Sequence, residues 1–286
     1  MKRFLRTLLG TGLLCAAFQL AAQQPTDPPP VLRIFREDIK EGKAAAHERT
    51  EAKFAQAMLK NKYPVNSLGM TTISGMNQAW FLEAHASFAS IGQSEAALSS
   101  PDYEMLDTLD AESRASSRSW IAVYRADMSY HAKELVETLP KARYINVITF
   151  RVRQGKDEEF AAVAKTAVAA LAKSGSDQPA VAYQIVSGSP NGVYLLFEPT
   201  ASMKTFDDQP ARSRAFYQAM GDSGMKKFTK DVNDAVASTE AVLFQFNPKM
   251  SYVSKEFAAG DPDFWTPKPA KGVTSAKPAA KRVAAK

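Results

Sequence analysis

The most constraining feature of this sequence is that its middle part occurs twice. Three pairs of short segments recur: Glu41-Gly42-Lys43 with Gln154-Gly155-Lys156, Ser74-Gly75 with Ser187-Gly188, and Met128-Ser129-Tyr130 with Met250-Ser251-Tyr252. The first two pairs are 113 residues apart and the third 122, so about nine residues are inserted between Gly188 and Met250. Such a repeat predicts two similar structural units in one chain.

Each copy has the same order of secondary-structure signals. The first copy predicts a strand at 31–39, a helix at 43–61, strands at 66–73 and 79–84, helical segments within 87–116 and a strand at 118–125. The second predicts a strand at 143–152, a helix at 157–173, strands at 180–186 and 193–197, a longer helical region at 201–237 and a strand at 240–247. The helices show apolar residues at steps of three and four, whereas the strands alternate or are continuously apolar. A strand–helix–strand–strand–helix–strand order indicates an α+β, ferredoxin-like module whose helices cover one face of an antiparallel sheet.

The uncovered sheet faces predict how the two modules meet. Two such modules can bury these faces against each other and close into a barrel. In element order and duplication, residues 31 to about 252 resemble the dimeric α/β-barrel superfamily. That superfamily includes cofactor-free monooxygenases of antibiotic biosynthesis, NIPSNAP-type proteins and haem-handling relatives. Two subunits usually build the barrel in those families, so the resemblance implies an intramolecular version of that dimer.

The two ends of the chain have compositions unlike the body. Residues 1–23 carry a basic start and a short apolar run, which predict a signal peptide and an exported, periplasmic or extracellular protein. The remaining expected boundaries are a Pro-rich spacer at 24–30, a first module at 31–130, a linker at 131–142, a second module at 143–252 and a disordered Lys/Pro/Ala-rich tail at 253–286. The tail is either a solubilising segment or a weak contact to anionic surfaces.

Charge and cysteine content exclude several function classes. Formal net charge is +6, of which the first 23 residues contribute +3 and residues 261–286 contribute +4, leaving about −1 for the body. A body near neutrality has no electrostatic footprint for nucleic acid. The only cysteine is Cys15, within the expected signal peptide, so the mature protein has no disulfide and no thiolate ligand for a metal.

The repeat permits an internal comparison of the first helix of each module. With the 113-residue offset, His47 corresponds to Phe160 and Glu51 to Ala164. His47 and Glu51 are four apart and share a helix face. Either they line a pocket as candidate catalytic groups, or they lie at the edge of the apolar stripe, half in water.

A second polar pair lies on the strand at 79–84 and just after it. With an offset of 114 across the hairpin, Glu83 matches Phe197 and His85 matches Pro199. Glu83 and His85 face the same way and are candidate proton-transfer groups, or metal ligands if a third ligand joins them. The simpler interpretation is a strand end that emerges into solvent. The spacing of histidines and cysteines contains no metal-binding cluster, so no metal site is expected.

Aromatic residues suggest where a ligand would bind. Arg118, Trp120 and Tyr124 share one face of the last strand of the first module, and Trp80 lies on the opposite side of its strand from Glu83. Together these four suit a flat or anionic ligand, although aromatic residues at strand spacing are also typical of a core.

These observations lead to several hypotheses about function. The first is a non-catalytic protein that binds a small apolar or aromatic ligand between the sheets, without a cofactor. The alternatives are a cofactor-independent, monooxygenase-like enzyme that uses His47, Glu51, Glu83 or His85; a haem-binding protein that uses His47 or His85; and an envelope scaffold with a filled interior.

Overall fold

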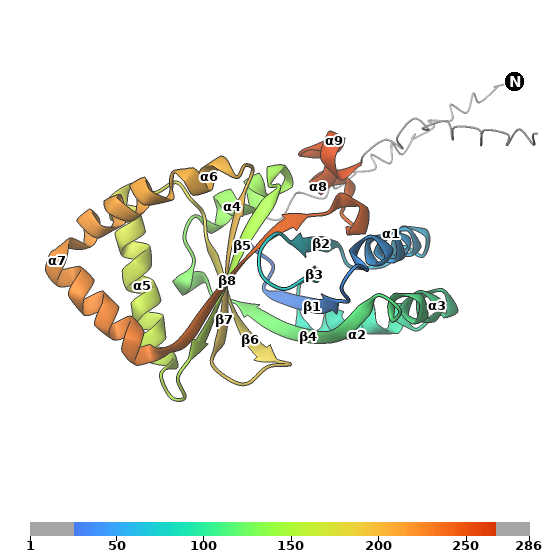
Figure 1. Cartoon of the computed structure of the whole chain (residues 1–286), viewed down its shortest axis with the longest axis horizontal. Coiled ribbons are helices and arrows are strands. Elements are labelled where there is room, and N and C mark those ends of the chain that lie inside the picture. The colour runs from blue at the N-terminus through green and yellow to red at the C-terminus, as the bar shows by residue number, and fades with distance from the viewer. Residues whose placement is uncertain (1–25, 267–286) are drawn as a thin grey trace, which may run out of the picture.

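The computed structural model describes residues 26–266 and shows one closed eight-stranded β-barrel with helices outside it (Figure 1). The strands are β1 (Val31–Ile39), β2 (Ser67–Thr72), β3 (Gln78–His85), β4 (Arg114–Tyr124), β5 (Tyr144–Val152), β6 (Val181–Ser187), β7 (Val193–Thr200) and β8 (Val236–Phe246). Their order around the barrel is β1-β3-β2-β8-β5-β7-β6-β4, and every pairing is antiparallel. The expected signal peptide and the last twenty residues lie outside the described range.

Helices lie outside the barrel, and the longer ones cover the outer face of their own module's sheet (Figure 1). The helices are α1 (Ala44–Lys60), α2 (Phe88–Leu98), α3 (Pro101–Asp110), α4 (Ala132–Thr138), α5 (Asp157–Ser174), α6 (Lys204–Asp207), α7 (Gln209–Ala235), α8 (Lys255–Ala259) and α9 (Pro262–Trp265), with short 3₁₀ turns η1 (Ala126–Met128), η2 (Leu139–Lys141) and η3 (Pro248–Met250). In Figure 1, α1 and α3 lie on one side of the barrel, and α5 and α7 on the opposite side. Among the described residues, no helix is both long and apolar enough to cross a membrane.

The barrel confirms the predicted fold class of two ferredoxin-like modules joined as an intramolecular dimeric α/β barrel. Strand alternation sends one set of side chains inward, and these form a single core shared by both modules. That core includes Ile34, Trp120, Leu195 and Phe244, all at most 3% exposed. Because the inward residues of both sheets are large and apolar, neither sheet could leave its inner face in water.

The repeated Met-Ser-Tyr segments join the two modules at the seams of the barrel. Tyr130 of the first module forms a β-bridge with Ala180 of the second, and Tyr252 forms one with Ser67 of the first. In the second case Ser251 Oγ also accepts a hydrogen bond from the backbone N–H of Gly69, at 2.9 Å. A Cβ at Gly69 would lie 2.6 Å from the carbonyl oxygen of Met250, so a glycine is required at this crossing. Each module therefore ends by adding backbone pairing to the other.

The strand register corrects the predicted match across the hairpins. Ile34 pairs with Leu82 and Val147 pairs with Phe197, so the offset between β3 and β7 is 115 and not 114. The loop after Gly188 is longer than its counterpart after Gly75, and a slip of one residue moves every side chain to the other face. Glu83 consequently matches Glu198. The offset reaches 122 between β4 and β8, so most inserted residues lie in the helical region between β7 and β8, as predicted.

The expectation of a disordered tail from residue 253 is wrong for 253–266. This segment forms α8 and α9, and Trp265 is buried against Phe246 and Phe257. The Trp265 indole N–H donates to the carbonyl oxygen of Pro140 at 2.6 Å. One large aromatic residue that is both packed and hydrogen-bonded offsets the entropy cost that composition alone predicted would prevail.

Candidate functional site

The barrel has an apolar cavity of about 380 Å³ at the end where α4 and α8 lie. Side chains of both modules form its walls, including Leu32, Leu82, Val181 and Phe197. The polar groups among its lining residues, such as Asn66 and Ser254, are few. A concave, mostly apolar space with a few polar groups is the usual form of a small-molecule site.

Segments expected to be spacer, linker and tail enclose this cavity. Pro28 and Pro29 lie beside it, together with residues of α4 and with Phe257 of α8. The Tyr183 hydroxyl donates to the carbonyl oxygen of Pro29 at 2.8 Å and so holds the N-terminal segment across the opening. The spacer and the tail thus cover the barrel end in the folded protein.

The structure separates the four residues expected to bind a ligand together. Trp80 and Trp120 are buried in the barrel core in an edge-to-face contact at 5.7 Å, and the guanidinium of Arg36 lies 4.4 and 4.2 Å from their ring centroids. Burial, followed by repulsion from Arg118, lowers the pKa of Arg36 to about 10. Arg118 itself is 57% exposed at the other end of the barrel, where Arg36 and Asp38 also lie.

Tyr124 is the member of that set nearest to the cavity, because its ring contacts Tyr183, a lining residue, at 5.7 Å. Arg36, which sequence analysis did not select, packs against both tryptophans of the set that was expected to bind a ligand. The sequence did indicate its position, because strand alternation puts Arg36 on the same inward face as Leu32 and Ile34.

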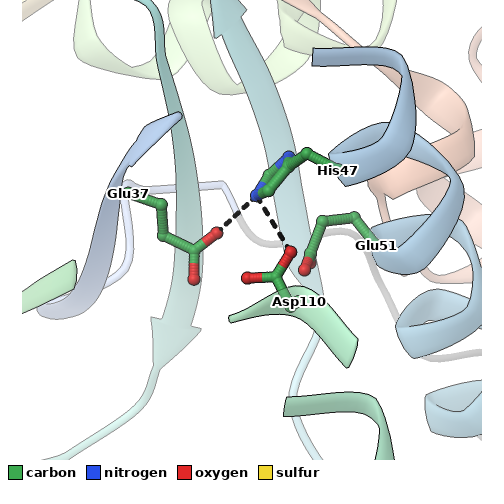
Figure 2. Close-up of side chains that lie close together, drawn as sticks. All are labelled: Glu37, His47, Glu51 and Asp110. Carbon is green, nitrogen blue, oxygen red and sulfur yellow. Dashed lines mark hydrogen bonds and ion pairs between the residues drawn. The ribbon is translucent and has the colours of Figure 1, made fainter. Parts of the chain in front are cut away.

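The polar residues of the first helix lie outside the barrel, between α1 and the sheet. His47 is 2% exposed and Glu51 is 8% exposed, so the half-solvated alternative is wrong for both, whereas the pocket-lining alternative holds for Glu51, which borders a cavity outside the barrel, and not for His47. His47 Nε2 lies 2.7 Å from Glu37 Oε2 and 3.6 Å from Asp110 Oδ1 (Figure 2). The Glu51 side chain points into the same group from the next turn of α1.

Arg114 provides the cation of this cluster. Its guanidinium is 3.0 Å from Glu37 Oε1, 3.3 Å from Asp110 Oδ2 and 2.8 Å from Asp107 Oδ1. Burial alone would lower the pKa of Arg114, but hydrogen bonds to Asp107 and Glu37 raise it above its usual value. Burial, followed by repulsion from Glu37 and Asp110, raises the pKa of Glu51 well above the ordinary value. The pKa of Asp110 is raised by burial and by Glu37 as well.

A second histidine–carboxylate pair lies in the same layer. Glu83 accepts a hydrogen bond from the Tyr63 hydroxyl at 2.8 Å, and His85 Nε2 lies 3.4 Å from its other oxygen. His85 is 1% exposed, so the strand end does not emerge into solvent there. Burial and the nearby Glu83 carboxylate raise the pKa of Tyr63. A second cavity of about 320 Å³ has Glu37, Glu51 and Glu83 among its lining residues, whereas neither imidazole is among them.

The second module has apolar residues where the first has this cluster. By the register of the strands, Glu37 corresponds to Phe150 and Arg114 to Val236. Sequence reasoning missed Glu37, although the same 113-residue offset would have found it. Asp110 and Arg114 needed the 122-residue offset, which only the observed strand pairing assigns to them.

Comparisons with known proteins support the fold and not an activity. The chain matches no family model and no curated protein sequence. Among solved structures, a protein of Fusobacterium nucleatum described as a candidate monooxygenase is 11% identical, with a TM-score of 0.51, and the match covers 77% of this chain and 93% of that one. Chlorite dismutase from Candidatus Nitrospira defluvii is 10% identical over 77% of this chain and 92% of that chain, with a TM-score of 0.46. A NIPSNAP domain protein from Burkholderia xenovorans is 17% identical, with a TM-score of 0.30 over 34% of this chain and 95% of that one.

This chain has the dimeric α/β-barrel fold. Here both halves of the barrel belong to one polypeptide, as the internal repeat predicted. At such low sequence identity, the likeness concerns the fold alone, because one fold supports many unrelated activities.

Proposed function

We propose that this protein binds a small, largely apolar molecule in the cavity at the α4–α8 end of the barrel. The observation that carries the proposal is the cavity itself, about 380 Å³ in size and lined mainly by apolar side chains from both modules. Burial of apolar ligand surface there would supply about 25 cal/mol per Å² before the costs of association. The few polar groups among the lining residues, such as Asn66 and Ser254, would orient a ligand that carries one polar end.

A cavity-filling variant tests this proposal. Leu68 lines the cavity and is partly exposed, so Leu68→Trp should occupy the space without overpacking the core. Binding of a fluorescent apolar probe such as 1-anilinonaphthalene-8-sulfonate, measured by titration, should weaken at least tenfold. The matched control is Val186→Trp, because Val186 is exposed on β6 outside the lining set, and this variant should bind like the wild type. Equal binding by both variants would refute the proposal, and mass spectrometry of material extracted from the purified protein would identify a natural ligand.

A second candidate is a cofactor-independent oxygenase activity in the first module. The specific observation in its favour is the hydrogen-bonded Glu37–His47 pair, whose carboxylate borders the 320 Å³ cavity and could transfer protons. Oxygen uptake in the presence of a panel of phenolic substrates, lost in His47→Gln and retained in Leu68→Trp, would favour this function over binding. Haem ligation is less well supported, since the Nε2 atoms of both His47 and His85 already face carboxylates in buried positions.

We also propose that the protein is exported and acts outside the cytoplasm. The support for export is the basic start and short apolar run of residues 1–23. Fractionation of cells that express the full chain, together with mass spectrometry of the mature N-terminus, tests it. A product found in the cytoplasm with Met1 retained would refute export.

A further inference from the structure

The cluster under α1 brings together donor atoms of the kind that bind metal ions. One ligand atom from each of Glu37, His47, Glu51 and Asp110 can be chosen so that all lie within 4.8 Å of one another. They come from β1, from two successive turns of α1 and from the end of α3, so three elements converge on one point (Figure 2). Ligands about 2.1 Å from an ion lie roughly 3.0–3.5 Å apart, and the 3.6 Å between His47 Nε2 and Asp110 Oδ1 is slightly longer than that range.

The cluster has more carboxyl groups than its own cation can pair with. Glu37, Glu51 and Asp110 contribute three carboxyl groups, and Arg114 is the positive side chain that contacts two of them. A divalent cation would balance these carboxylates in the ionised form, whereas ionised carboxylates without a partner are costly in a buried site.

Asp110 Oδ2 is the atom of the cluster that the surrounding protein leaves unsatisfied. It is buried and accepts no hydrogen bond, although Arg114 lies 3.3 Å from it. Glu51 is 8% exposed and points into the cluster, and no hydrogen bond to its carboxylate is found among residues 26–266 (Figure 2). A buried polar atom without a partner calls for an explanation, and an ion at this point would provide one.

The second module shows that the fold does not require these groups. At the matching positions it has the apolar residues Phe150, Phe160, Ala164, Val232 and Val236, which belong to or pack against its own core cluster. A polar cluster that the same architecture can replace with apolar packing serves a purpose other than stability. The neighbouring 320 Å³ cavity borders Glu37 and Glu51 and gives an ion a route to the site.

We propose that Glu37, His47, Glu51 and Asp110 bind one divalent transition-metal ion of the manganese, iron and zinc group. One imidazole with three carboxylates is a donor set of intermediate hardness, which favours these ions over Ca²⁺ and Mg²⁺. Arg114 would position the carboxylates of Glu37 and Asp110 from outside the donor set, as second-layer hydrogen bonds do in metal sites. This inference does not depend on the ligand cavity in the barrel.

Titration of the full chain with metal salts tests the proposal. After treatment with EDTA and dialysis, isothermal titration with Zn²⁺ and Mn²⁺ should show one saturable site, and Ca²⁺ should not compete at equal concentration. Glu51→Gln and His47→Gln should each weaken Zn²⁺ binding by about 100-fold or more, because each removes a direct ligand. The matched control is Glu83→Gln, a buried carboxylate of the same layer that pairs with His85, and its affinity should stay within twofold of the wild type.

Spectroscopy of the unaltered protein keeps the test independent of whether the variants fold. Co²⁺ bound by one imidazole and three carboxylates should give visible d–d absorption at one equivalent, and Zn²⁺ should displace it. Absence of saturable Zn²⁺ and Mn²⁺ binding and of the Co²⁺ spectrum would overturn the proposal. Unchanged affinity in Glu51→Gln and His47→Gln would do so too, since the ion would then bind elsewhere.

Discussion

The buried cluster of the first module allows a prediction about the stability of the metal-free protein. In Arg114→Met, the carboxylates of Glu37 and Asp110 would lose the cation that lies 3.0 and 3.3 Å from them. Removal of one partner from a buried ion network typically costs about 3–5 kcal/mol. We expect a loss of that size in the free energy of unfolding at neutral pH.

The second module suggests a variant in which apolar residues replace the whole cluster. Replacing the whole cluster with the residues of the other module gives Glu37→Phe, His47→Phe, Glu51→Ala, Asp110→Val and Arg114→Val. Apolar replacement of a complete buried ion network is often neutral or stabilising by about 1–4 kcal/mol. The fivefold variant should therefore be at least as stable as the metal-free wild type, although it includes loss of the same arginine.

Urea denaturation with EDTA present, followed by tryptophan fluorescence and circular dichroism, measures both variants. The control is Lys60→Met, which removes an exposed ion pair with Asp102 at 3.1 Å and should cost less than about 1 kcal/mol. If Arg114→Met costs no more than Lys60→Met, the carboxylates do not depend on Arg114. If the fivefold variant is less stable than Arg114→Met, the idea that apolar packing can replace the cluster is refuted.

Three further predictions concern the closure of the barrel and its buried carboxylates. Trp265→Ala should lower the free energy of unfolding by about 3–5 kcal/mol, because it removes the aromatic contacts and the hydrogen bond to Pro140. The control is Tyr217→Ala, at an exposed residue, which should change the free energy of unfolding by less than about 0.5 kcal/mol in the same urea assay. Ser251→Ala should lower the free energy of unfolding by about 1–3 kcal/mol, because it leaves the N–H of Gly69 without a partner. Hydrogen exchange at the Gly69 amide should become faster, and unchanged exchange would contradict this prediction. Burial raises the pKa of Glu198 despite a hydrogen bond from Asn146, so the native state holds its proton more tightly than the unfolded state. The stability from that proton is complete below the unfolded pKa and is lost as pH rises through the folded value. Glu198→Gln should therefore gain stability relative to the wild type as pH increases from 4 to 7, and a constant difference across that range would refute the assignment.

Much of the fold could be predicted because it depends on local patterns and on the repeat. The order of strands and helices follows from apolar periodicity, and the duplication implied that the uncovered sheet faces would be shared. The internal comparison also indicated that the first module is the polar one, from His47 and Glu51 opposite Phe160 and Ala164. These are properties of the chain that do not require any long-range contact to be known.

The site could not be predicted because it depends on register and on distant contacts. Glu37 and Arg114 are 77 residues apart and meet only through the pairing of β1 with β4. The hairpin offset of 114 was wrong by one residue, so it matched Glu83 of the first module with Phe197 of the second and not with Glu198. An error of one residue matters because side chains alternate between the two faces of a strand.

The sequence alone therefore determined that two ferredoxin-like modules would form one barrel, and that the first would carry polar groups where the second has apolar ones. Only the tertiary structure decided that those groups lie under the helices and outside the barrel, and that residues 253–266 close one end. The physical reason is that periodicity is encoded over a few residues. The position of a side chain relative to a cavity instead depends on strand register, barrel closure and the docking of residues such as Trp265.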